Sequence, residues 1–193
     1  MRFRFYGLVL VATALSAAPV HGQGGGTFSA GLAGGGTSSE LNGGVVNTDF
    51  RWGGTAGAFL AYNNWYTVWA LEGNWVQKGG TGTRMSYVEF PLTVGGGISA
   101  SQGGLLFRLY TGIAFAAKVS CSSDVALINC DRAKSTEWSW PVGIQFGKWT
   151  NGGKLIGVDV RYNLGLSDAF EDLLPVNRTW YFRAIIGTRL GGG

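Results

Sequence analysis

Apolar and polar side chains alternate with a period of two through most of the chain beyond its N-terminal segment. The stretch IGVDVRYNLGLS, at 156–167, shows the pattern clearly: every second residue is apolar or aromatic up to Leu166, and Asp159 and Arg161 fall between them. Side chains of a β-strand point alternately to its two faces. The pattern therefore predicts a strand with one apolar face and one face of charge, amide and glycine.

Eight segments of this kind follow one another along the chain. We predict β-strands at about 26–34, 51–62, 65–78, 84–97, 104–118, 136–149, 154–167 and 178–190. Tight turns, as at 63–64 and 150–153, alternate with connections that are mostly long and polar, at 35–50, 119–135 and 168–177, although the connection GGTGT is short. Bacterial outer-membrane barrels show this asymmetry, with short periplasmic turns and longer outer loops. The alternation of loop lengths therefore favours a barrel over a soluble sandwich.

The apolar faces of these strands decide which side of the sheet faces the interior. An eight-stranded barrel has room inside only for its own side chains or for one small ligand. Eight rows of Trp, Phe and Leu do not fit that space, whereas glycine and short polar residues do. We therefore expect the apolar face to point outward, into lipid. The predicted fold class is all-β: an eight-stranded, antiparallel, up-and-down transmembrane β-barrel.

Charged residues in the inward phase of the predicted strands form a balanced set. Near the middle of the strands this set comprises Glu72, Glu89, Arg108, Asp159, Arg161 and Arg183. A buried charge without a partner costs several kcal/mol, and the set contains as many acidic as basic members. The sequence therefore predicts a lumen filled by a network of paired charges, while the individual pairs stay open.

Aromatic and proline positions add two further expectations. Tryptophans lie mostly near the predicted strand ends, and indoles concentrate where lipid meets water. The predicted aromatic girdle comprises Trp52, Trp65, Trp75, Trp138, Trp149 and Trp180. Pro91 and Pro141 lie within predicted strands, where each removes a ladder hydrogen bond. We expect a local bulge at both prolines.

The N-terminus MRFRFYGLVLVATALSAAPVHGQ has a basic start, a short apolar run and small residues before Gln23. This composition is typical of a secretory signal peptide. We predict a signal peptide at 1–22 and a barrel domain at 23–193, in the bacterial outer membrane after export. Loss of Arg2 and Arg4 lowers the formal net charge from +4 to +2, so nothing favours a nucleic-acid partner.

Two cysteines, Cys121 and Cys130, lie close together in a polar connection. An even number of cysteines in an exported protein predicts a disulfide. The only histidine, His21, lies in the predicted signal peptide, which leaves no ligand set for a metal and no His-assisted nucleophile. We therefore predict no cofactor and no enzymatic activity.

Several segments together resemble the PorT-like family of bacterial outer-membrane β-barrel proteins. The matching segments, between about 65 and 190, are LEGNWVQKGG, SYVEFPLTV, VDVRYNLGLSDA and NRTWYFRAIIGTRL. They are similar to the family's Glu-bearing strand ending in Gln-Lys-Gly, its Tyr-x-Glu-x-Pro strand, its Arg-Tyr-x-x-Gly-Leu strand and its closing Gly-x-Arg strand. The last strand differs in having Leu190 where the family usually has an aromatic residue. The resemblance implies an envelope location and no enzyme activity.

The function that follows is a small, non-enzymatic outer-membrane barrel with a side-chain-filled lumen. Its outer loops would serve envelope structure or interaction at the cell surface. Expected partners are outer-membrane lipid and the barrel-assembly machinery during biogenesis; the surface partner is not predicted, and we expect a monomer. Two alternatives remain open: a soluble lipocalin-like ligand-binding barrel, and an outer-membrane enzyme that modifies lipid.

Overall fold

The computed structural model describes residues 26–43, 46–64, 67–99, 104–125, 128–170 and 175–190. The predicted signal peptide at 1–22 lies outside these residues. Within the described part of the chain, no helix is long and apolar enough to cross a membrane.

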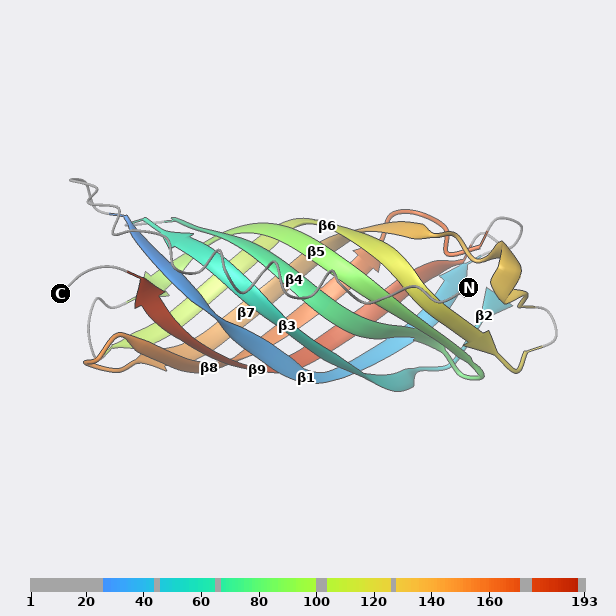
Figure 1. The fold of residues 1–193 in the computed structure, drawn as a ribbon, viewed down its shortest axis with the longest axis horizontal. Coiled ribbons are helices and arrows are strands. Elements are labelled where there is room, and N and C mark those ends of the chain that lie inside the picture. Colours follow the sequence, from blue (N-terminus) through green and yellow to red (C-terminus); the bar gives the residue numbers. More distant parts are fainter. Residues whose placement is uncertain are drawn as a thin grey trace, which may run out of the picture.

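The strands form one closed antiparallel sheet (Figure 1). The elements are β1 (Thr27–Gly43), β2 (Val46–Asn47), β3 (Arg51–Asn63), β4 (Thr67–Gly80), β5 (Thr83–Ser99), β6 (Leu105–Ser123), the 3-10 helix η2 (Cys130–Arg132), β7 (Thr136–Trp149), β8 (Lys154–Gly165) and β9 (Val176–Leu190). Neighbours in the sheet follow chain order, and β1 also pairs with β9, from Phe28↔Leu190 to Asn42↔Val176. Eight long strands therefore close the predicted barrel, and the two-residue β2 pairs only with Asn42 and Gly43 at the end of β1.

The two ends of the barrel differ in their connections. One, here called the turn end, holds the start of β1, the end of β9 and the connections after β3, β5 and β7. The other, the loop end, holds the connections after β1, β4, β6 and β8. Two tight turns use glycine in the left-handed region: Gly82, with φ 76°, joins β4 to β5, and Gly153, with φ 70°, joins β7 to β8.

Two of the predicted long connections are shorter than expected. The segment 35–50 was predicted as a loop, but β1 continues to Gly43 and pairs with β3 and β9 on its two sides. Strand β6 likewise continues to Ser123, beyond the predicted end at residue 118. The residues added to the predicted strand, GGTSSELNG at 35–43, have no apolar alternation that would reveal a strand. Hydrogen bonding to β3 and β9 nevertheless makes these residues part of the strand.

The prediction of bulges at Pro91 and Pro141 is wrong. Pairs are missing near Pro91 between β4 and β5, and near Pro141 between β6 and β7, yet both ladders resume in the same register. The missing N–H of proline removes hydrogen bonds without inserting a residue. The register shift lies instead between Ser86 and Tyr87, on the ladder of β5 with β6.

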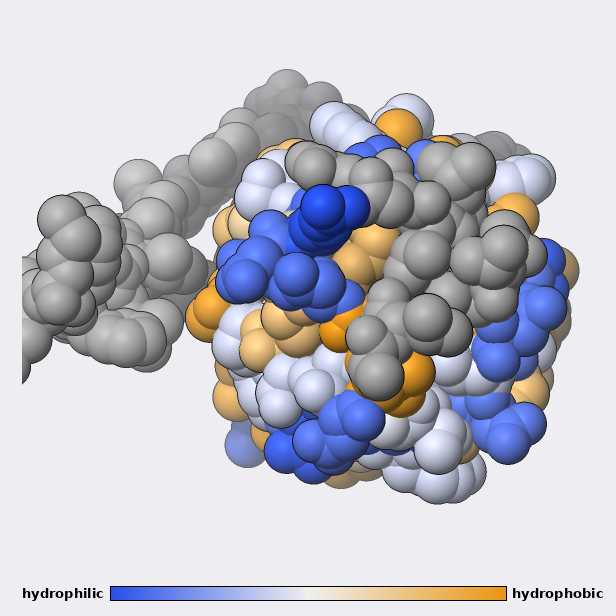
Figure 2. All heavy atoms as spheres, turned by 90° about the vertical axis from the view of Figure 1, so that its right-hand side faces the viewer, coloured by the Kyte–Doolittle hydropathy of each residue, from blue (hydrophilic) through white to orange (hydrophobic). Residues whose placement is uncertain are grey.

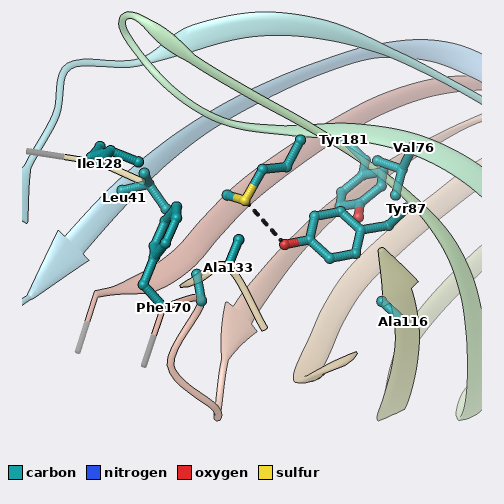
Figure 3. Close-up of a cluster of buried hydrophobic side chains, with 10 residues drawn as sticks. Leu41, Val76, Tyr87, Ala116, Ile128, Ala133, Phe170 and Tyr181 are labelled. Carbon is teal, nitrogen blue, oxygen red and sulfur yellow. Dashed lines mark hydrogen bonds between the residues drawn. The ribbon is translucent and has the colours of Figure 1, made fainter. Parts of the chain in front are cut away.

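Apolar side chains close the lumen at both ends. At the loop end they form a cluster, here called the apolar plug (Figure 3), that comprises Leu41, Val76, Met85, Tyr87, Ala116, Ile128, Ala133, Ala169, Phe170 and Tyr181. Ile128 and Phe170 come from connections that fold over the barrel mouth. There an isolated antiparallel β-bridge pairs Ala133 with Phe170. At the turn end, Ala33, Leu106, Trp149, Leu155 and Ile185 pack together.

Seen from the loop end, the molecule is rounded, and hydrophilic residues gather around its rim with apolar residues between them (Figure 2). The polar rim and the apolar plug thus occupy the same end. The connections therefore turn their polar groups to the outside and bury their apolar ones in the mouth.

Candidate functional site

The outer wall of the barrel is apolar. The exposed large side chains along it include Leu32, Leu71, Leu92, Leu109, Ile113, Val142, Phe146, Ile156, Val158, Phe182 and Ile186. These are the residues of the phase predicted to point outward. A water-soluble barrel buries such side chains, because each apolar group in water costs free energy in proportion to its area. The wall is therefore suited to contact with lipid.

Most outward tryptophans lie toward the loop end, whereas Trp69, at the start of β4, lies at the turn end. Trp52, Trp75, Trp138 and Trp180 are 39–68% exposed, and each lies in the half of its strand nearer the loop end. Predicted girdle member Trp65 lies outside the described residues. Among described residues, the aromatic contacts nearest the turn end involve other side chains, such as Phe28 and Tyr62, whose ring centroids are 5.0 Å apart.

The assignment of Trp149 to the girdle is wrong. Its side chain points into the lumen, where it is only 2% exposed and packs against Leu106 and Leu155. The Arg189 guanidinium lies 4.5 Å from its ring centroid. Strand periodicity explains the position, because Trp149 shares the phase of inward-facing Glu137.

Four of the predicted lumen charges come together in one group, here called the central cluster: Glu72, Asp159, Arg161 and Arg183. Arg183 pairs with Asp159 at 2.7 Å and with Glu72 at 2.8 Å, and Arg161 pairs with the other oxygen of Glu72. Asp159 and Arg183 are direct partners in the register of β8 with β9.

Tyr110 links Asp159 and Arg161, two members of the central cluster that make no direct ion pair with each other. Its hydroxyl donates to Asp159 Oδ1 at 2.6 Å and accepts from Arg161 Nε at 2.9 Å. Asn74 adds a bond to Glu72 Oε2 at 2.9 Å. Each carboxylate of the cluster therefore receives several donors, which offsets the cost of removing its charge from water.

Glu89 belongs to a separate group nearer the loop end, here called the loop-end cluster: Lys78, Glu89 and Glu137. The Lys78 ammonium lies 2.6 Å from Glu89 Oε2 and 2.9 Å from Glu137 Oε1. Asn163 and Tyr181 donate to Glu89, and Asn177 donates to Glu137. Lys78 and Glu137 were not among the predicted network residues, although their inward phase was visible in the sequence. The prediction considered only positions near mid-strand.

Arg108 is buried but stands apart from both clusters. Among the described residues it makes no ion pair. Its guanidinium donates to Gln145, Val68 and Thr93 at 3.3–3.4 Å and lies 5.0 Å from the ring centroid of Tyr110. The inward phase of its strand predicted that Arg108 lies in the lumen, but it did not show that the neighbouring side chains would be neutral.

Taken together, the buried charges of the described lumen are four acidic and four basic side chains. The loop-end cluster has one excess negative charge, and Arg108 has one positive charge without a paired carboxylate. Ion pairs and hydrogen bonds cross the lumen between strands, and apolar side chains cover both ends. Such an arrangement ties the strands of the barrel wall together across a lumen filled with side chains.

Cys121, on β6, forms a disulfide with Cys130, in η2. Cys121 and Val125 pack against the apolar plug, so the bridge ties the connection that covers the barrel mouth to the wall. In the described part of the chain, no group of three or more His, Cys, Asp or Glu side chains is placed to hold a metal ion.

No family model and no curated protein matches the sequence. Solved structures do match. Neisserial surface protein A aligns over 86% of this chain and 99% of its own, with 12% identity and a TM-score of 0.53. The likeness shows the fold: a small, closed antiparallel barrel.

Two further structures align with lower scores. Ail, the attachment invasion locus protein of Yersinia pestis, matches over 88% of this chain and 100% of its own, with 13% identity and a TM-score of 0.45. Outer membrane protein AlkL, solved in DMPC bilayers, matches over 92% and 96%, with 13% identity and a TM-score of 0.47. The resemblance to the PorT-like family stays a prediction.

Proposed function

We propose that the protein is an integral barrel of the bacterial outer membrane, without enzymatic activity, whose loop end faces outward and serves surface interaction or envelope structure. The observation that supports this most is the contrast between the two faces of one sheet. The outside is apolar at every level of the wall, and the inside holds eight buried charges. Only a surrounding apolar medium makes that distribution favourable.

The same contrast counts against the lipocalin-like alternative. A soluble ligand-binding barrel keeps an apolar cavity inside and a polar surface outside, whereas here the described lumen is occupied by ion pairs and tyrosines. A lipid-modifying enzyme needs an accessible nucleophile or acid–base group at the lipid boundary. The acidic side chains of both clusters are at most 6% exposed and already bonded to neighbouring groups.

Surface interaction is the role that the loop end supports. Its connections at 124–125, 128–135 and 166–170 are held by a disulfide, a bridge between Ala133 and Phe170, and the pair of Lys134 with Asp168 at 3.4 Å. Ordered polar loops on a rigid scaffold make a binding surface with a low entropic cost of ordering.

Membrane fractionation tests the proposal. The protein is expected in the outer-membrane fraction, resistant to alkaline extraction, with heat-modifiable migration on a detergent gel. Protease added to intact cells should cleave at Arg132 or Lys134, in the connection after β6. Recovery of folded protein from the periplasm without detergent would contradict the membrane location, and protection of both sites in intact cells would contradict the orientation.

A further inference from the structure

Three buried asparagines of the lumen bind glutamates in the same way. The side-chain nitrogens of Asn74, Asn163 and Asn177 each donate to a carboxylate, at 2.9 Å for Asn74 and at 3.1 Å for Asn163. Each of the three residues is 1% exposed. The carboxylates fix the orientation of the amides, because the reverse orientation would point an amide oxygen at a negative charge.

The oxygens of these amides differ in their surroundings. In the central cluster, the oxygen of Asn74 accepts from Arg183 Nη1 at 3.4 Å, so the amide links a cation to Glu72. In the loop-end cluster, the oxygens of Asn163 and Asn177 are buried and have no hydrogen-bond partner within the described part of the chain. A buried acceptor without a donor is unfavourable. The two amides of the loop-end cluster therefore need a donor that Asn74 already has.

A third oxygen without a partner lies beside them. Thr179, 0% exposed, pairs with Asn163 in the register of β8 with β9 and shares the inward face of β9 with Asn177. Its hydroxyl also lacks a hydrogen bond to any described residue. Directly opposite side chains on paired strands have Cβ atoms about 4.5–5.5 Å apart. One water molecule spans such a separation with two hydrogen bonds of about 2.8 Å.

We propose that Asn163, Thr179 and Asn177 hold internal water, which supplies to the loop-end cluster the donors that Arg183 supplies to the central one. Water donates to the amide oxygens, and the polarised amides donate more strongly to their glutamates. The loop-end cluster has two carboxylates and one ammonium, so stronger donors stabilise its excess negative charge.

The apolar plug covers this water site. Two of its members, Leu41 and Tyr181, lie next to the site (Figure 3): Leu41 pairs with Asn177 across β1 and β9, and Tyr181 is the next inward residue after Thr179. Water held there is therefore separated from the bulk solvent by apolar side chains.

Water fits the site better than a metal cation does. Calcium takes about six to eight oxygen ligands and magnesium about six, whereas the unpartnered oxygens here are those of Asn163, Asn177 and Thr179. The buried charges of the described lumen, four acidic and four basic, also balance without an added ion. A water molecule needs only about two to four polar partners and adds no charge.

A crystal structure of the full chain, at a resolution that shows ordered water, tests the site directly. We expect a density peak about 2.7–3.0 Å from both Asn163 Oδ1 and Thr179 Oγ1. Thr179→Ser keeps the hydroxyl and should keep the peak, whereas Thr179→Val should lose it. The absence of a peak between the two oxygens in the wild type would overturn the inference. A peak with about six oxygens within about 2.6 Å would overturn it in favour of a cation.

Unfolding by urea in detergent tests the site through the direction of the change. If the Thr179 hydroxyl is dry, Thr179→Val removes an unpartnered polar group and raises the midpoint. If the hydroxyl holds water, the substitution lowers the midpoint. Thr37→Val is the matched control, because the equally buried Thr37 donates to the Gln77 carbonyl at 2.8 Å. We expect both substitutions to lower the midpoint, and a rise for Thr179→Val alone would overturn the inference.

Discussion

The central cluster and the loop-end cluster occupy the same lumen but are neutralised differently. In the central cluster two carboxylates meet two arginines, and Glu72 contacts both guanidinium groups. In the loop-end cluster two carboxylates share one ammonium, that of Lys78. The first arrangement keeps an ion pair for Glu72 when one arginine is removed. The second depends on the single side chain of Lys78. The two clusters are equally buried, but they should not tolerate the loss of a cation equally.

The difference also reflects the chemistry of the cations. Arginine offers five donors in a planar fork and can bridge two carboxylates, as Arg183 does between Asp159 and Glu72. Lysine is a compact charge with three donors, and here it lies at the centre of its cluster, 0% exposed. Amide and phenol groups complete the second arrangement: Asn163, Asn177 and Tyr181 donate to the two glutamates.

Replacing Lys78 tests the comparison most strongly. Lys78→Met keeps most of the length of the side chain but leaves Glu89 and Glu137 buried together without a cation. Removal of one partner from a buried pair costs about 3–5 kcal/mol, and we expect a loss of this size in the free energy of unfolding in detergent. Urea titration followed by tryptophan fluorescence measures it.

The exposed lysine at the turn end provides the control for this change. Lys154→Met should alter the unfolding free energy by no more than about 0.5 kcal/mol. Adding Glu89→Gln and Glu137→Gln to Lys78→Met should recover most of the loss, because neutral amides need no cation. Equal midpoints for Lys78→Met and Lys154→Met would show that the loop-end cluster is not held by its lysine.

Arg161 provides the matching test in the central cluster. Arg161→Met removes one cation, but Glu72 keeps Arg183 at 2.8 Å and Asn74 at 2.9 Å. The expected loss is about 1.5–3 kcal/mol, the range for hydrogen bonds to charged groups, and thus smaller than for Lys78→Met. Arg84→Met, at an exposed arginine, serves as control in the same urea titration. A loss as large as that of Lys78→Met would remove the distinction between the clusters.

Arg108, which has neutral neighbours, should be the least costly buried cation to remove. Its hydrogen bonds are 3.3–3.4 Å long and none of their acceptors is charged. We therefore expect Arg108→Met to cost about 1 kcal/mol, the value for an ordinary hydrogen bond. A loss above that of Arg161→Met would indicate that its charge stabilises the clusters over a longer range.

Strand periodicity was sufficient to predict the closed barrel, because phase alone assigns each residue to the inner or outer face. All six predicted network residues lie in the lumen for this reason. The same rule would have placed Trp149 inside, but its position at a strand end suggested a girdle. The division into two clusters could not be predicted, since partners such as Glu72 and Arg161 are 89 residues apart and meet through the stagger of strands that do not pair with each other. Only the second half of β1 escaped detection, because glycine and serine occupy its outward face at 34–38.

The disulfide should have the smallest effect on the barrel and a local effect at its mouth. Cys121 and Cys130 are nine positions apart, and closing such a ring disfavours the unfolded chain by about 2–3 kcal/mol. In Cys121→Ser the cost is limited by the free energy of opening this one connection, because β6 and β7 remain paired without it. We therefore expect an unfolding midpoint near that of Ser120→Ala, a control on the same strand.

Trypsin should cleave faster after Arg132 and Lys134, and amide exchange should rise at 128–133 but not at Asp159 or Arg161. The apolar plug covers the loop-end cluster and not the central cluster. Amide exchange that rises equally at 128–133 and at Asp159 and Arg161 would therefore show that the lumen opens as a single unit. Failure of Cys121→Ser to assemble would show that the connection is needed for folding as well as for covering the mouth.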